Sequence, residues 1–207
     1  MFRKFLNPDN ALMITMTQIT DCIFLSLFWL LGCVPVVTVG ASTAALYDAV
    51  YHGFRRGDQH PWKRCVTSFK MNLAASVVPT VVHLLLLGCG GYAMVQLWNG
   101  AVAGSLSWVV FAGAGFVGVL ALGILSVLFP LLSRFENPIG VLLKNTLLLS
   151  LANLPRTLAL GVLNAAAGYV CVRFVFPVFV VPALAALIAT ALLEPMFRPY
   201  MPSEDAA

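Results

Sequence analysis

Five apolar segments alternate with polar ones along the chain. They cover residues 14–37, 73–97, 108–131, 157–174 and 178–193. A helix needs about 20 apolar residues to cross a bilayer, and each segment approaches that length. The first segment is polar at its start. Its uninterrupted apolar part, 22–37, would form a helix of only about 24 Å, which is shorter than a ~30 Å hydrocarbon core. We therefore expect an all-α bundle of about five transmembrane helices, or four with a re-entrant or interfacial first helix.

Two polar zones, 38–72 and 132–156, separate these segments. In the first zone, apolar residues recur at helical spacing from Leu46 to Phe54, while Asp48 takes the other side. This pattern predicts an amphipathic helix at the membrane surface. We expect two more short helices of this kind, at 61–71 and 138–151, so each zone carries a layer of helices outside the bilayer.

Positive residues indicate the orientation of the chain. The zone 38–72 contains five Lys and Arg residues and the zone 132–156 contains three, whereas the turn 98–107 has none. Cytoplasmic loops carry such an excess, so both zones and the C-terminus are expected inside a cell membrane. Five crossings place the N-terminus outside. Arg3 and Lys4 oppose that placement and favour the four-span alternative.

Composition supports the membrane assignment. Of 207 residues, 60% are hydrophobic and only 10% are charged, whereas soluble domains carry roughly 25% charged residues. We expect one membrane domain, 1–195, followed by a polar tail, 196–207. The basic residues stand beside apolar segments, which indicates lipid and topology signals rather than nucleic acid. These residues are Arg55, Arg56, Lys63, Arg64 and Lys70.

Asp21 is the strongest candidate for chemistry. A carboxylate in an apolar segment costs a few kcal/mol if it is deep and unpaired, and such residues are often functional. Gln18 lies within one helical turn of it, and Asn164 is a further polar residue in an apolar segment. These three residues form a candidate solute or proton site. A helix cap or an ion pair at the membrane interface is the simpler explanation of Asp21.

A second group of polar and turn-forming residues gathers on the expected cytoplasmic side. We interpret it as a docking or structural motif. Its members are Gly40, Ser42, Thr43, Arg134, Glu136, Asn137, Pro138, Pro155 and Arg156. The chain lacks a phosphate-binding GxxxxGK[ST] loop, an HExxH helix and a GxSxG elbow, and its five cysteines are scattered. We therefore expect no enzymatic activity, no metal site and no cofactor.

Three stretches carry a family resemblance: VPVVTVGASTAALYDAV (34–50), SFKMN (68–72) and FPLLSRFENP with LLLSLANLPRTL (129–158). In their residues and their order along the chain, they resemble the YesL-type membrane proteins of Gram-positive bacteria, a family of undefined function. The resemblance implies a role beside carbohydrate uptake and breakdown, because genes of this family commonly lie next to genes for those processes. It implies no ligand-binding residue.

Three functions remain open from the sequence. The first is a non-enzymatic accessory to carbohydrate uptake or sensing, docked through the cytoplasmic helices to a sugar transporter or sensor. The second is a small transporter or channel for a sugar-like or other small solute. The third is a membrane assembly factor. The expected partners are the lipid bilayer, such a membrane protein and a second copy of the chain.

Overall fold

The computed structural model describes residues 11–58, 60–135, 138–174 and 176–200, with side chains from residue 16 onward. Every regular element in this part of the chain is helical, which confirms the all-α prediction. The elements are α1 (Ala11–Gly32), η2 (Val36–Thr38), α2 (Val39–Val50), η3 (Tyr51–Arg55), α3 (Pro61–Val102), α4 (Trp108–Arg134), α5 (Ile139–Ala152), α6 (Leu154–Arg173), η4 (Phe176–Phe179), α7 (Val181–Phe197) and η5 (Arg198–Tyr200).

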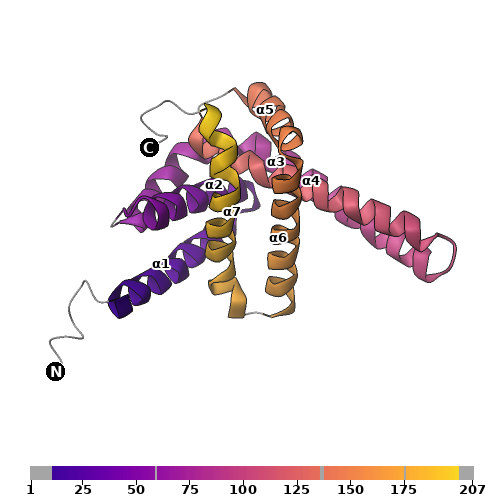
Figure 1. The fold of residues 1–207 in the computed structure, drawn as a ribbon, viewed down its shortest axis with the longest axis horizontal. Helices are drawn as coiled ribbons and strands as arrows, with labels where there is room; N and C mark the ends of the chain where they lie inside the picture. The colour runs from indigo at the N-terminus through magenta and orange to yellow at the C-terminus, as the bar shows by residue number, and fades with distance from the viewer. Residues whose placement is uncertain (1–10, 59, 136–137, 175, 201–207) are drawn as a thin grey trace.

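Helix α2 lies in the middle of the molecule, packed against α1, α3, α4 and α7 (Figure 1). Its residues from Gly40 to Val50 are buried, with the exception of the half-buried Thr43. The prediction of an amphipathic surface helix over 43–56 is therefore wrong. Its small residues GASTAA let four helices approach at once, and Asp48 is buried because it has partners inside the protein.

Helices α1 and α2 form an antiparallel hairpin. Near the turn, the indole nitrogen of Trp29 donates a hydrogen bond to Thr43 Oγ1 over 3.2 Å. The Thr38 hydroxyl donates to the carbonyl of Gly32 over 2.6 Å and so closes the turn. At the open end, Cys22 and Cys65 belong to the same buried cluster. The middle of α1, around Cys22, therefore lies beside the beginning of α3.

Helix α3 runs without interruption for 42 residues. It joins the short helix expected at 61–71 to the apolar segment 73–97, so the expected break near residue 72 is absent. Pro79 lies inside it and is buried, and the Thr80 hydroxyl bonds back to the carbonyl of Ser76 over 2.6 Å. Neighbouring hydroxyls of this kind re-satisfy the backbone that a proline disturbs in membrane helices.

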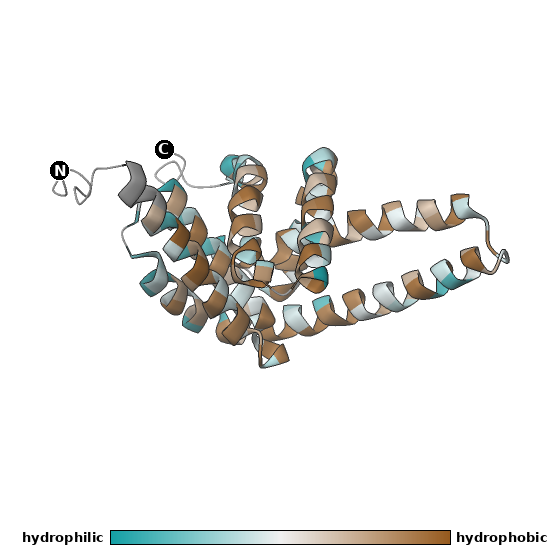
Figure 2. Cartoon of the chain, turned by 90° about the horizontal axis from the view of Figure 1, so that it is seen from below, coloured by the Kyte–Doolittle hydropathy of each residue, from teal (hydrophilic) through white to brown (hydrophobic). Residues whose placement is uncertain are grey.

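Helices α3 and α4 form a long hairpin whose outer half extends away from the other helices (Figures 1 and 2). Gly104 has a positive φ of 72° at the tip, a conformation that glycine adopts readily. The Ser107 hydroxyl then accepts a hydrogen bond from the Val109 amide and caps α4. Trp98 and Trp108 pack edge to face beside this turn, with ring centroids 5.8 Å apart.

The inner part of α4 crosses α6 at very close range. A Cβ at Gly123 would collide with the carbonyl of Thr157, and one at Gly161 would collide with the carbonyl of Val119. Small residues permit this kind of contact between membrane helices. Helix α6 is also bent by 104° from α5 at the break between them, and η4 and α7 follow it along the chain.

Three helical segments in the described residues are long and apolar enough to cross a membrane: α3, α4 and Val181–Tyr200. The bent pair α5–α6 raises the number to four if it counts as one span. The apolar part of α1, Met16–Gly32, is too short to be included. The number is lower than five, and it agrees with the four-span alternative in which the first helix does not cross.

Candidate functional site

A buried polar cluster holds the C-terminal end of α2 to α4 and α7. The Tyr47 hydroxyl donates a hydrogen bond to Glu194 Oε1 over 2.8 Å, and Arg134 Nη2 donates to the same oxygen over 2.6 Å. The Arg134 guanidinium also lies over the ring of Tyr51, 3.7 Å from its centroid. Burial, followed by the charge of Glu194, raises the pKa of Tyr47 well above 10, so its hydroxyl remains a donor.

Asp48 ties the same end of α2 to α3. Its carboxylate lies 3.1 Å from Arg64 Nε and 3.1 Å from His52 Nδ1. Burial on its own raises the pKa of Asp48. The hydrogen bond from His52 and the charges of Arg64 and His52 outweigh burial, so the pKa is lowered overall and the carboxylate stays ionised.

Most of the basic residues predicted to contact lipid or set topology have partners within the protein. Arg55 Nε donates to Thr190 over 2.9 Å, and Arg56 Nε donates to the Tyr51 hydroxyl over 3.2 Å. Lys63 lies over the ring of Trp62, with 5.4 Å between Nζ and the centroid. Lys70 is exposed on α3. Arg55 and Arg64 therefore connect separate helices, whereas the bond of Arg56 to Tyr51 is local.

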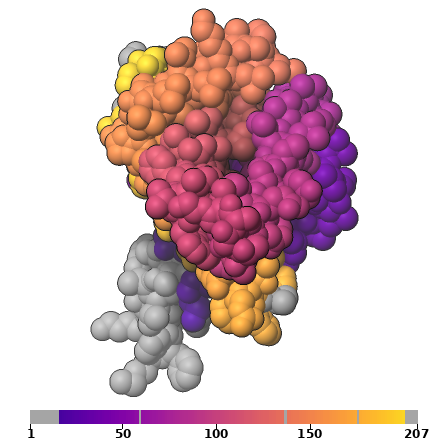
Figure 3. Space-filling view, turned by 90° about the vertical axis from the view of Figure 1, so that its right-hand side faces the viewer, coloured from indigo at the N-terminus to yellow at the C-terminus, as the bar shows by residue number. Residues whose placement is uncertain are grey.

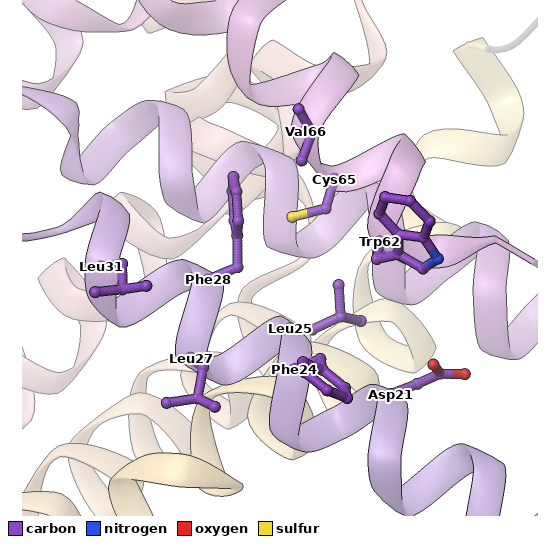
Figure 4. Close-up of a pocket in the computed structure, with 9 residues that line it drawn as sticks. All are labelled: Asp21, Phe24, Leu25, Leu27, Phe28, Leu31, Trp62, Cys65 and Val66. Carbon is purple, nitrogen blue, oxygen red and sulfur yellow. The ribbon is translucent and has the colours of Figure 1, made fainter.

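Asp21 lies at one end of an apolar groove of about 560 Å³ between α1 and the beginning of α3 (Figure 4). The other lining residues are Phe24, Leu25, Leu27, Phe28, Leu31, Trp62, Cys65 and Val66. Sugars require several polar groups for recognition, and this lining supplies few. The groove is suited to an apolar ligand with one polar end.

The structure does not bring the other two members of the predicted solute site into this groove. Gln18 is exposed on α1, outside the set of lining residues. Asn164 lies on α6, where its amide donates to Ser126 Oγ over 3.0 Å and to the carbonyl of Leu160 over 2.9 Å. Asn164 therefore belongs to the crossing of α4 and α6.

The first part of the predicted docking motif is inside the bundle. Gly40 is buried, and a Cβ there would collide with Thr80 and Phe129. The Ser42 hydroxyl donates to the carbonyl of Thr38, and the Thr43 hydroxyl donates to that of Val39. These three residues are structural contacts of α2 and are not available to a docking partner.

The second part of the motif is divided among several places. Arg134 joins the polar cluster, whereas Glu136 and Asn137 lie outside the described residues. Pro138 precedes the first turn of α5, and Pro155 stands in the first turn of α6. Arg156 Nη1 approaches Asn153 Oδ1 at 3.4 Å. Among the described members of this second part, Pro138 and Pro155 are exposed and Arg156 is half-buried.

Sequence reasoning missed Tyr47, Glu194 and Trp62. Glu194 carried a signal, because it is an acidic residue at the end of a long apolar stretch, where an ionised side chain needs a partner. Trp62 carried none, since its place beside Asp21 depends on how α1 and α3 pack. Within the described residues, no group of three or more His, Cys, Asp or Glu side chains is arranged to hold a metal ion.

Comparison with known proteins gives one match. The family described as "Protein of unknown function, DUF624" matches residues 22–95, which run from α1 through α2 to the outer part of α3. No curated protein and no solved structure matches the chain. The matched region contains the central helix, Asp48 and every residue that lines the groove except Asp21. It is similar to an uncharacterised family, and it is part of a helical bundle with helices suited to cross a membrane.

Proposed function

We propose that this chain is a non-enzymatic accessory membrane protein that docks a partner membrane protein through the outer half of the α3–α4 hairpin. The observation that carries the proposal is the projection of this hairpin beyond the other helices (Figures 1 and 2). The sequence analysis predicted docking through the cytoplasmic helices. Because α2 is buried, we assign the docking surface to the hairpin instead.

The outer half of the hairpin presents apolar side chains to its surroundings. The exposed large ones are Leu85, Leu86, Tyr92, Val95, Trp98, Val102, Trp108, Val109, Val110, Phe116 and Val117. They come from both helices, which face the viewer at the front of Figure 3. A membrane protein exposes such a surface to lipid or to another transmembrane helix.

The exposed glycines of the hairpin favour another transmembrane helix over lipid as the neighbour of this surface. A Cβ built at Gly88, Gly90, Gly91 or Gly113 would meet no atom within 4 Å. Glycine inside a helix costs about 1 kcal/mol relative to alanine, and nothing in the described part of the chain uses the space it leaves. Small residues on an exposed face allow the backbone of a second helix to approach closely. The partner proposed here therefore contributes a transmembrane helix.

The resemblance to YesL-type proteins supports the biological context of the proposal. We place the partner among the membrane proteins of carbohydrate uptake or sensing in Gram-positive bacteria. The charged residues of both polar zones and the C-terminus face the cytoplasm in this proposal, in keeping with the excess of Lys and Arg in these zones.

A matched pair of photo-crosslinking sites tests the docking surface in native membranes. Tyr92 on the hairpin and Tyr169 on α6 are both aromatic and are 68% and 69% exposed. A photoreactive phenylalanine at Tyr92 is expected to capture one distinct membrane protein, whereas the same residue at Tyr169 captures lipid alone. Equal capture of lipid at both sites would overturn the proposal. Capture of a second copy at Tyr92 would replace the partner with a homo-oligomer.

A further inference from the structure

The groove beside Asp21 has a closed floor and an open rim. Leu25 and Cys65 form the floor and are each 1% exposed. Phe24, Leu31 and Trp62 stand at the rim and are all exposed. The floor is therefore part of the buried interior of the bundle, and the rim is open to a molecule entering from outside the protein.

The polar groups of the groove are at one end. Figure 4 shows the Asp21 carboxylate and the indole nitrogen of Trp62 on the same side, with Leu31 at the opposite end. Polar residues also precede Asp21 on α1, and the charged loop before Pro61 precedes Trp62 on α3. The end with Asp21 thus faces polar surroundings, and the remainder of the groove is apolar.

The dimensions fit a single acyl chain. From Asp21 to Leu31 the helix rises about 15 Å, which is half of a ~30 Å hydrocarbon core and so the depth of one leaflet. The groove, of about 560 Å³, is within the size range of small-ligand sites, and its apolar lining suits an extended hydrocarbon chain.

The charges at the polar end select the headgroup. The ion pairs of the described residues are His52–Asp48, Arg64–Asp48 and Arg134–Glu194, so none of them neutralises Asp21. A protonated amine would complement this carboxylate through a charge-assisted hydrogen bond. Lys63 stands beside Trp62 and is placed to attract a phosphate. One anionic and one cationic side chain suit a zwitterionic headgroup with a primary amine.

We propose that this groove binds one phospholipid of the phosphatidylethanolamine class. One acyl chain lies along α1 over Leu25 and Phe28, and the amine hydrogen-bonds to Asp21. The headgroup phosphate lies near Lys63 and the Trp62 indole. The site is separate from the outer half of the α3–α4 hairpin, so it can be tested without the docking partner.

Native mass spectrometry of the purified full chain tests the lipid. The protein in detergent receives equal amounts of phosphatidylethanolamine, phosphatidylcholine and phosphatidylglycerol with identical chains. One phosphatidylethanolamine is expected to remain bound, and Asp21→Asn is expected to lower its retention about tenfold because the neutral amide no longer attracts the charged amine. Asp58→Asn is the matched control, since Asp58 is an exposed carboxylate outside the groove, and its retention is expected to be unchanged.

A second variant tests the apolar part of the groove. Val66→Trp fills the space and is expected to reduce retention of all three lipids, with the helical content checked by circular dichroism. Preferential retention of phosphatidylglycerol, or equal retention of all three lipids by the unmodified protein, would overturn the headgroup assignment. No effect of either Asp21→Asn or Val66→Trp would place the retained lipid elsewhere on the protein and overturn the site.

Discussion

The crossing of α4 and α6 and the outer half of the α3–α4 hairpin use glycine in opposite surroundings. At the crossing, Gly123 and Gly161 face backbone carbonyls so closely that no side chain fits. On the hairpin, Gly91 and Gly113 face open space. The same residue type therefore marks a contact already made in one region and a surface without its contact in the other.

This difference separates the residues that stabilise the fold from the residues that are available for association. The inner body is held by close backbone contacts and by paired charges around α2, so a substitution there changes stability. The hairpin is held by the packing of two helices on one another, so a substitution on its outer surface changes association with another molecule. The following predictions test this division, beginning with the largest expected effect.

Breaking the buried ion pair of the body is expected to cost most. Arg134→Ala or Glu194→Ala should lower the free energy of unfolding by about 3–5 kcal/mol, because each leaves one buried charge without its partner. The double variant Arg134→Met with Glu194→Leu should be less damaging than either single variant, since neither charge remains. Denaturant unfolding in detergent micelles measures all three. A loss below 1 kcal/mol for both single variants would show that the pair is open to water.

A pair of identical substitutions tests the glycine comparison directly. Gly123→Ala should lower the free energy of unfolding by about 3 kcal/mol, because the new methyl group meets the carbonyl of Thr157, which cannot rotate away. Gly113→Ala should instead raise it by up to about 1 kcal/mol, through better helix propensity alone. Thermal unfolding of both variants in the same micelles gives the comparison. Equal destabilisation would contradict the division between body and hairpin.

Acid should act on the body through Asp48. The lowered pKa of Asp48 in the folded protein means that the unfolded chain, with a carboxyl pKa of about 3.9, binds a proton at higher pH. The stabilisation is therefore present above about pH 4 and is lost as the pH falls through the folded pKa. Asp48→Asn should lower the free energy of unfolding by about 1.5 kcal/mol at pH 7 and should weaken its decrease at low pH. Unfolding midpoints measured from pH 3 to pH 7 provide the test, with Asp58→Asn as the control.

Substitutions on the hairpin surface should change the free energy of unfolding least and the association with a partner most. Gly91→Leu should leave the free energy of unfolding within about 1 kcal/mol, because the exposed position has room for a side chain. It should nevertheless weaken photo-crosslinking at Tyr92 several-fold by blocking close approach of the partner. Gly168→Leu on α6, also in open space, is the matched control. Unchanged crosslinking in Gly91→Leu would argue against a helix at this face.

Composition and hydrophobic segments were enough to predict an all-α membrane bundle. The turn at 98–107 and the break between the apolar segments 157–174 and 178–193 were also visible, since prolines, glycines and aromatic residues mark the ends of apolar helices. The side of the membrane that each end faces remains a prediction from the distribution of Lys and Arg. These features are local, and a sequence reports local features well.

The position of α2 was not predictable in the same way. A spacing of four residues from Leu46 to Phe54 fits a surface helix and a buried helix equally, and the choice depends on partners elsewhere in the chain. Asp48 finds Arg64 after 16 residues, whereas Arg134 finds Glu194 after 60. The groove likewise arises from two helices that the sequence does not show to be neighbours.

The bond between Tyr47 and Glu194 has a consequence for biosynthesis. The two residues are separated by 147 positions. At roughly 5–20 residues per second, a ribosome needs about 7 to 30 s to synthesise the intervening chain. During this delay the polar end of α2 exists without the helix that completes its burial. The insertion machinery or a chaperone therefore has to shelter it, and a chain truncated before α7 presents an incomplete polar end to membrane proteases.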